Sequence, residues 1–503
     1  MIIRGKIKLF TIIGLVLSVL FFALVTFTSI PLGIPDDWVW TRITEFPGFP
    51  VYELIAIVLF LAIAIFCAFK IDFQLSKLTN KLVYVFLIIV MSMMFDYYVL
   101  LSGRAGVSEH IFAVIDPYTS GYLMVAGEIK EPGKYFSSFD KVLEKDAYDS
   151  NHIDVHPFGN IAFCYAVLEW CRKSPTPSWL IEKLLPDNIM ADVRAAGKNG
   201  VFHGVTQSDT VYTAAAVIVL IFLAMNFISR IMLVAALLIM TKGGSRNLGL
   251  NTVLLGFSIP ALILFLGQHD VMMFFIGSIC TLLLTLTIKY EWKKFPVFAV
   301  LTGVMLGIGV IHTLAFSMFI FAAILTIFCC RRLSGRYLKI SALLGGGLSV
   351  VALCMLWGID IITICLLASR NNSRFFAESG RCWYWFPFNF LDFIIFLSPF
   401  LAILPLLLLP KFKMLKRLKF APAQALVLSC VVTIFILLIS PFSRGEMGRL
   451  LLFFMPIYLL SACLALAYQK LSNKIYFLCV LNSIAAVALL LALRFALKLT
   501  MTF

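Results

Sequence analysis

Long apolar runs recur along the whole chain, and they constrain its fold more than any other feature. The run at 9–30 spans 22 residues without a charge. A bilayer core about 30 Å thick requires about 20 such residues per helix. The chain has 503 residues, of which 61% are hydrophobic and 13% charged, far from the composition of a soluble protein. We therefore expect an all-α polytopic membrane protein.

About thirteen transmembrane helices are predicted. They lie at 9–30, 51–69, 82–101, 210–229, 248–267, 271–288, 297–313, 314–330, 341–369, 391–409, 421–440, 450–468 and 475–497. The first run is too long for the apolar region of a cleaved signal peptide, so we expect it to be retained. The stretch 230–247 is either an interfacial helix or an extension of the fourth span. The glycines in 297–330 permit either close packing of two helices or a break in the helix.

Basic residues alternate with these spans. With the N-terminus in the cytoplasm, every connection on that side carries Lys or Arg, and of the 26 acidic residues only Asp72 and Glu291 fall there. The positive-inside rule thus accounts for the net charge of +15 better than binding to nucleic acid does. All six histidines map to the outer side, where an active site is expected. Short loops favour a bacterial cytoplasmic (inner) membrane, with the C-terminus outside.

One connection, at 102–209, is far longer than a turn. Its helical patterns are expected to lie along the outer membrane surface, between the third and fourth spans. This divides the chain into residues 1–101, with three spans and the first outer loop; the loop region 102–209; and residues 210–503, with the remaining spans. No internal repeat is found, which disfavours an inverted-repeat transporter. The twelve cysteines form neither a disulfide framework nor a metal-thiolate pattern.

The first outer loop reads PLGIPDDWVW and places two carboxylates, Asp36 and Asp37, beside Trp38 and Trp40. Such a stretch fits a solvated loop tip with interfacial tryptophans. It also fits a catalytic site, because a carboxylate can act as general base and a flat indole face can stack on a sugar ring.

Further candidate residues lie on the same side of the predicted membrane. Taken singly, the HPFG turn also fits a helix start, GQHD a tight hairpin, and the arginines interface anchors. Yet arginines on the outer side oppose the positive-inside rule, and guanidinium groups pair well with lipid phosphates. The candidates are His156, His269, Asp270, Arg444, Glu446, Arg449 and Arg104, with Arg370 and Arg374 in addition.

The arrangement resembles the GT-C superfamily of integral membrane glycosyltransferases. The resemblance lies in the acid in the first outer loop, the long outer region after the third helix and about a dozen helices. TSGYLMVAGEIKEPGKYFSSFDK followed by DVHPFGNIAF is similar to a Tyr-containing segment that precedes a His-Pro-Pro-Gly turn, with Phe158 replacing the second proline. SIPALILFLGQHD and SRGEMGRLLLFFMPIYLL also resemble stretches of bacterial members.

The resemblance implies a hexosyl- or pentosyltransferase of cell-envelope glycan biosynthesis. Its donor would be a polyprenyl-phosphate-linked sugar, and its acceptor a lipid, glycan or protein. Asp37 or Asp36 would be the catalytic base, and Arg444 and Arg449 would contact the lipid phosphate. The remaining substrate-binding candidates are His156, His269, Asp270, Glu446, Arg104 and Trp38. Adjacent aspartates, rather than Asp-x-Asp, favour a metal-independent enzyme without cofactor.

Two other functions remain open. An O-antigen-type polymerase or ligase also has about a dozen helices and a long outer loop, but needs no acidic pair in the first loop. A transporter or flippase of a lipid-linked glycan requires ionisable residues within the spans. Asp96, Arg230 and Asp360 are the only such residues, and each falls near a predicted span end.

Overall fold

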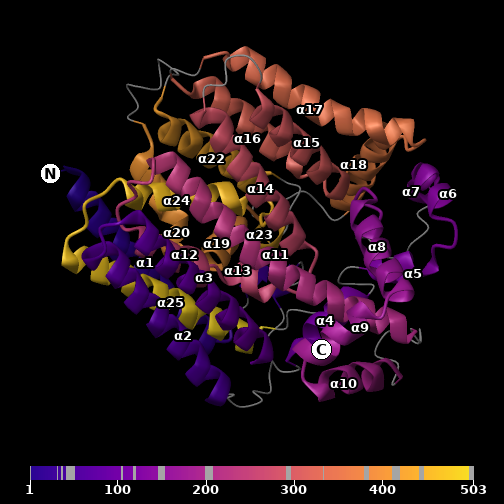
Figure 1. Ribbon diagram of the computed structural model, residues 1–503, viewed down its shortest axis with the longest axis horizontal. Coiled ribbons are helices and arrows are strands. Elements are labelled where there is room, and N and C mark those ends of the chain that lie inside the picture. The colour runs from indigo at the N-terminus through magenta and orange to yellow at the C-terminus, as the bar shows by residue number, and fades with distance from the viewer. Residues whose placement is uncertain are drawn as a thin grey trace.

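The chain folds as a bundle of helices, with one two-stranded hairpin among the described residues (Figure 1). The computed structural model describes residues 2–30, 32–34, 38–40, 51–102, 106–116, 121–144, 153–198, 208–290, 296–331, 334–378, 385–410, 420–440 and 447–497. Asp36, Asp37, Arg104, Arg444 and Glu446 lie outside these residues, as does the side chain of Trp38.

Within the described residues, eight helices are long and apolar enough to cross a membrane, or nine if one bent pair counts as a single span. The eight are α1 (Ile2–Phe27), α2 (Val51–Phe69) with its π-helical end η1 (Lys70–Gln74), α3 (Leu78–Leu101), α11 (Asp209–Thr241), α14 (Asp270–Lys289), α17 (Arg336–Leu356), α22 (Pro422–Ile439) and α25 (Asn473–Ala496). The bent pair is α19 (Trp385–Leu397) followed by α20 (Pro399–Ile403) and η2 (Leu404–Leu408). Shorter apolar helices are α12 (Leu248–Phe257), α15 (Val297–His312), α16 (Phe316–Cys329) and α24 (Met455–Ala467). The polytopic all-α class is confirmed, and the count of thirteen stays a prediction.

Helices of the 102–209 region cap one side of the bundle. They are α4 (Val107–Ile115), α5 (Tyr122–Glu128), α6 (Pro132–Ser137), α7 (Phe139–Glu144), α8 (Gly159–Lys173), α9 (Thr176–Leu184) and α10 (Asp187–Lys198). They gather at the right and lower right of Figure 1, away from the N-terminal label. Five of them, α4, α5, α8, α9 and α10, pack against α11.

Segments expected on the cytoplasmic side lie together at one end of the bundle, which we name the basic end and define by Asp72, Asn247, Lys289 and Lys339. Asn247 Nδ2, for example, donates to the carbonyl oxygen of Leu466 at 2.9 Å. The opposite end, the site end, contains the segments expected outside. Among the described residues, several segments that the charge pattern assigns to one side thus contact one another, while the membrane side of each end stays a prediction.

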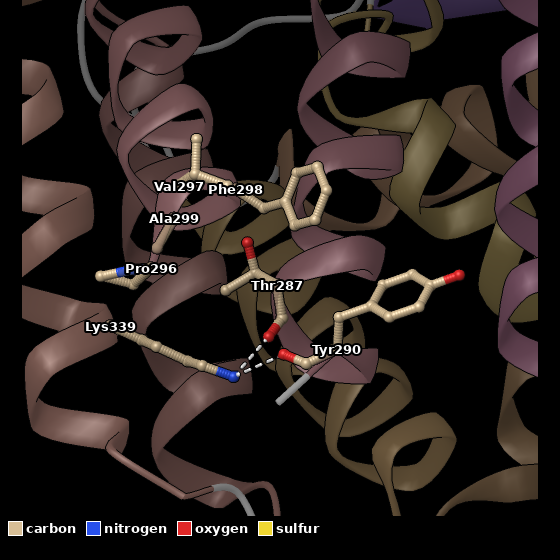
Figure 2. Close-up of a pocket in the computed structure, with 7 residues that line it drawn as sticks. All are labelled: Thr287, Tyr290, Pro296, Val297, Phe298, Ala299 and Lys339. Atoms are coloured by element: carbon tan, nitrogen blue, oxygen red, sulfur yellow. Dashed lines mark hydrogen bonds between the residues drawn. The ribbon is translucent and has the colours of Figure 1, made fainter. Parts of the chain in front are cut away.

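Lysines at the basic end satisfy backbone carbonyls at helix C-termini. Lys339 Nζ donates to the carbonyl oxygens of Thr287 and Tyr290 at 2.8 and 3.2 Å, in the small pocket of Figure 2. Lys289 Nζ donates to the carbonyl oxygen of Met240 at 2.9 Å. A cation near a helix C-terminus is favoured by the helix dipole and by the unpaired carbonyls there. These lysines therefore have a structural role beyond orienting the chain.

Asp72 has the converse role at the same end. Its two carboxylate oxygens accept from the backbone N–H groups of Gly249 and Leu250, each at 2.9 Å, at the start of α12. Tyr476 Oη donates to the same carboxylate at 3.1 Å. One of the two acids expected on this side is thus an N-cap supplied from another helix.

We expect Asp72→Asn to lower the free energy of unfolding by about 1–2 kcal/mol, because an amide can accept at one oxygen only. Thermal unfolding in detergent micelles measures this. The surface variant Lys130→Gln is the control, and an Asp72→Asn protein as stable as that control would contradict the capping role.

Several predicted spans are interrupted, and the breaks correct their boundaries. The span 341–369 is wrong: α17 ends at Leu356, and α18 (Ile361–Glu378) follows a turn in which Gly358 has φ +75°. The span 248–267 divides into α12 and α13 (Pro260–Leu264), since Pro260 lacks the N–H that would continue the helix. Between α19 and α20 the chain bends by 116° at Ser398, which has φ +79°. The helical pair 297–330 divides at residues 313–315.

The stretch 230–247 continues the fourth span, because α11 is one helix of 33 residues. Arg230 accordingly lies well inside a helix, and its placement near a span end is wrong. It forms a bidentate pair with Asp96 of α3, with contacts of 2.7 and 2.9 Å. Both side chains are buried. Asn226 and Ser92 complete the cluster through hydrogen bonds of 2.9 Å.

Candidate functional site

Four candidate residues from three separate stretches of the sequence lie near one another at the site end: His156, His269, Asp270 and Arg449. Arg449, on the short helix α23 (Met447–Leu450), has its Nε 3.8 Å from an oxygen of Asp270. Its Nη1 donates to Gln268 Oε1 at 3.5 Å. Arg449 is buried, and its charge acts on His156. The structure thus brings together residues that the sequence only assigned to one side.

His269 is buried among aromatic side chains. Its ring centroid is 4.8 Å from that of Tyr122 and 5.4 Å from that of Phe222, both edge-on, and Nε2 is 3.0 Å from Cys164 Sγ. Burial lowers its pKa to about 3, so the imidazole is neutral at pH 7. Burial likewise raises the pKa of the Cys164 thiol, so this contact joins two neutral groups.

Tyr122, at the start of α5, is the central residue that sequence reasoning missed. It lies against both His156 and His269, hydrogen-bonds Asn160, and is near enough to Asp270 and Arg449 to interact with their charges. Burial raises the pKa of its phenol, so it stays a neutral donor. The sequence likens its stretch to a Tyr-containing segment, but that stretch holds both Tyr122 and Tyr135, and the likeness does not assign a role to either.

His156 is half-buried in the turn before α8. Burial, aided by the positive charge of Arg449, lowers its pKa to about 4. It is therefore neutral at pH 7 and suited to hydrogen bonding rather than to pairing with an anion. Within the described residues, no three His, Cys, Asp or Glu side chains gather as a metal ion would require.

The glycine of the HPFG turn permits a close helix crossing. A Cβ on Gly159 would lie 2.7 Å from the carbonyl oxygen of Ile311 and 2.8 Å from Nδ1 of His312. The next residue, Asn160, has its Oδ1 3.0 Å from that same nitrogen. The turn is also held from α18, where Asn371 Nδ2 donates to the carbonyl oxygen of Asp154 at 3.2 Å.

Gly159→Ala is expected to lower the free energy of unfolding by about 1–3 kcal/mol, because the new methyl group overlaps the end of α15. Thermal unfolding of the purified protein measures this. Gly133→Ala, where a Cβ meets nothing within 4 Å, is the matched control. Equal stability of the two variants would show that the crossing can relax.

A second polar layer supports the GQHD loop from behind. The backbone N–H of Gly267 donates to Nδ1 of His110 at 3.2 Å, and a Cβ on Gly267 would lie 2.7 Å from the His110 Cα. The neighbouring Glu109 forms a buried ion pair with Arg494 of α25 at 2.8 Å. The loop that carries His269 and Asp270 is therefore fixed by α4, and α4 is fixed by α25.

The hairpin of the first outer loop is fixed at its second strand. Strand β1 (Leu32–Ile34) pairs antiparallel with β2 (Trp38–Trp40), with Leu32 opposite Trp40. Trp40 is buried, and its indole Nε1 donates to Asp392 Oδ1 at 3.0 Å. The other oxygen of Asp392 accepts the backbone N–H of Gly448 at 2.9 Å. Trp40 thus has a packing role.

The similarity of this chain to known proteins is limited. No family model matches the chain, and no curated protein matches it. A crystal structure of the oligosaccharyltransferase of Archaeoglobus fulgidus, tethered through a disulfide bond with an acceptor peptide containing the NVT sequon, is similar with a TM-score of 0.40 and 12% identity. The match covers 89% of this chain and 55% of that one, so the chain spans about half the length of that enzyme.

Proposed function

We propose that this protein is a membrane glycosyltransferase that moves a sugar from a polyprenyl-phosphate-linked donor to a lipid, glycan or protein acceptor. A first-loop aspartate, Asp37 or Asp36, acts as general base. The observation that carries the proposal is the hydrogen-bonded link from Trp40 through Asp392 to Gly448. It joins the strand that follows the acidic pair to the helix of Arg449.

The chemistry follows from the two charges. The aspartate takes the proton of an acceptor hydroxyl, whose oxygen forms a bond to the anomeric carbon of the sugar. The bond from that carbon to the phosphate oxygen breaks, and the electron pair leaves with the polyprenyl phosphate. Arg449 stabilises the departing phosphate in this proposal, with Arg444 as a further candidate. Displacement in line with the leaving group inverts the anomeric configuration.

Neutral residues near Arg449 suit a sugar. Tyr122, His156 and Asn160 supply uncharged hydrogen-bonding groups, and Tyr122 and His156 retain their neutral forms at pH 7 because both are buried or half-buried. Sugars present hydroxyl groups that both donate and accept, and such groups pair well with neutral polar side chains. Arg104, Glu446, Asp270, His269 and Trp38 complete the proposed substrate-binding set. The site is proposed to face the extracytoplasmic side of a bacterial inner membrane.

A flippase of lipid-linked glycans is the second candidate, because Asp96 and Arg230 lie buried within the bundle. Their opposite charges form an ion pair at 2.7 Å. Asn226 adds a hydrogen bond to Asp96, and Ser92 accepts one from Arg230. A paired cluster of this kind suits a fixed helix contact better than an ion pathway.

The test is transfer by the purified protein in nanodiscs, supplied with a panel of polyprenyl-phosphate hexoses and pentoses and a membrane-lipid extract as acceptor. Release of polyprenyl phosphate together with a glycosylated product is expected. Arg449→Ala should lower turnover by about 10²–10³-fold. Arg449→Lys should lower it by less, since lysine retains the positive charge but cannot donate two parallel hydrogen bonds as a guanidinium does. Translocation of donors across proteoliposomes without bond cleavage would instead establish the flippase.

A further inference from the structure

Asp392 connects three segments that are remote in the sequence. It lies on α19, it is buried, and it is 352 residues from Trp40 and 56 residues from Gly448. One carboxylate oxygen accepts the Trp40 indole N–H at 3.0 Å, and the other accepts the Gly448 backbone N–H at 2.9 Å. A carboxylate is suited to this place because both of its oxygens are acceptors.

Tight packing around Phe396, one turn further along α19, gives these hydrogen bonds little freedom. The Phe396 ring centroid is 5.1 Å from that of Trp40 and 5.6 Å from that of Phe265, and Trp40 and Phe265 are 5.9 Å apart. A Cβ on Gly448 would overlap the Phe396 side chain, so the α23 backbone packs closely on it. The strand and the α23 backbone therefore contact the same side chain.

We infer that Asp392 is a positioning residue that fixes the distance between the first-loop acids and Arg449. The inference rests on the proposed function. Asp37 precedes Trp40 by three residues in the sequence. Gly448 directly precedes Arg449. One oxygen of Asp392 thus holds the strand next to the proposed base, and the other holds the residue next to the proposed phosphate-binding arginine.

Two conservative substitutions separate this role from bulk packing. Trp40→Phe removes the indole N–H and retains an aromatic ring. Asp392→Asn retains the shape but places an NH2 group against one of the two donors, so it breaks at least one link. Because both changes act on one hydrogen-bonded unit, the double variant should be little worse than Asp392→Asn alone.

The basic end offers matched controls. Asp72 is also a carboxylate that accepts from backbone N–H groups, here two, and from one aromatic side chain, Tyr476. Tyr476→Phe therefore matches Trp40→Phe, and Asp72→Asn matches Asp392→Asn. These controls weaken the bundle at the opposite end and leave the proposed site intact.

The experiment compares all five variants as full-length protein in nanodiscs, with two measurements. Hydrogen exchange followed by mass spectrometry should rise at least 10-fold in peptides covering 32–40 for Trp40→Phe, and also in those covering 447–450 for Asp392→Asn. The kcat of transfer should fall at least 10-fold in both, with KM changed less than threefold. The controls should keep kcat within twofold at a comparable loss of thermal stability.

Each contrary result has a distinct meaning. Unchanged exchange in both peptides would overturn the coupling, as would a loss of kcat no larger than in the matched controls. Raised exchange confined to these peptides, in a protein whose wild type transfers no sugar from any donor in the panel, would support the coupling and contradict the proposed function.

Discussion

Asp37→Asn is expected to lower the rate of sugar transfer by about 10²–10⁴-fold, because an amide cannot accept the proton of the acceptor hydroxyl. The loss should fall on kcat, since the base acts in the transition state and contributes little to binding of the donor. Transfer assays in isolated membranes measure it, with the amount of folded protein matched by size-exclusion chromatography.

Asp36→Asn is the internal control for this result. The two acids are adjacent in the sequence, and one base suffices for the reaction. We expect the smaller loss at Asp36, since Asp37 adjoins Trp38 at the start of β2. A larger loss in Asp36→Asn would identify Asp36 as the base. Full activity in both variants would exclude the mechanism.

Asp96→Ala is expected to lower the free energy of unfolding by about 3–5 kcal/mol, because it leaves the buried Arg230 guanidinium without its counter-charge. Replacing both residues with apolar ones of similar size, as in Asp96→Leu with Arg230→Met, should restore much of that loss. Denaturation in mixed micelles, followed by circular dichroism, measures both variants.

The double variant also distinguishes the two candidate functions. A structural pair predicts that a stable double variant still transfers sugar at near the wild-type rate. Loss of flipping in that stable variant, with no transfer in the wild type, would instead give the pair a role in transport.

The charge pattern of the sequence predicts which segments share an end of the bundle, because the positive-inside rule gathers Lys and Arg in the connections on one side of a membrane. Lys289 and Lys339 illustrate this, since each lies at the basic end. The breaks were harder to predict. Ser398 has a positive φ with no glycine to indicate it, and Pro260 lies in an apolar run as continuous as that of an unbroken span.

Arg230 shows a second limit. Apolar composition locates a span but not its depth, and α11 is one apolar helix of 33 residues that also packs against the loop-region helices. The predicted span therefore ended too early. For the site, the charged candidates were found from their side of the membrane, whereas Tyr122 and Asp392 acquire their roles only through contacts with residues far away in the sequence.

The length of α11 sets the height of the proposed site. At 1.5 Å per residue the helix is about 50 Å long, some 20 Å longer than a hydrocarbon core. Phe222 contacts His269, and Arg230, eight residues later, is joined to Asp96, so about 12 Å of one continuous helix separates these levels. Because α11 is continuous between these levels, a bilayer that thins or thickens must adapt around the helix, while His269 keeps its distance along the helix axis from the ion pair.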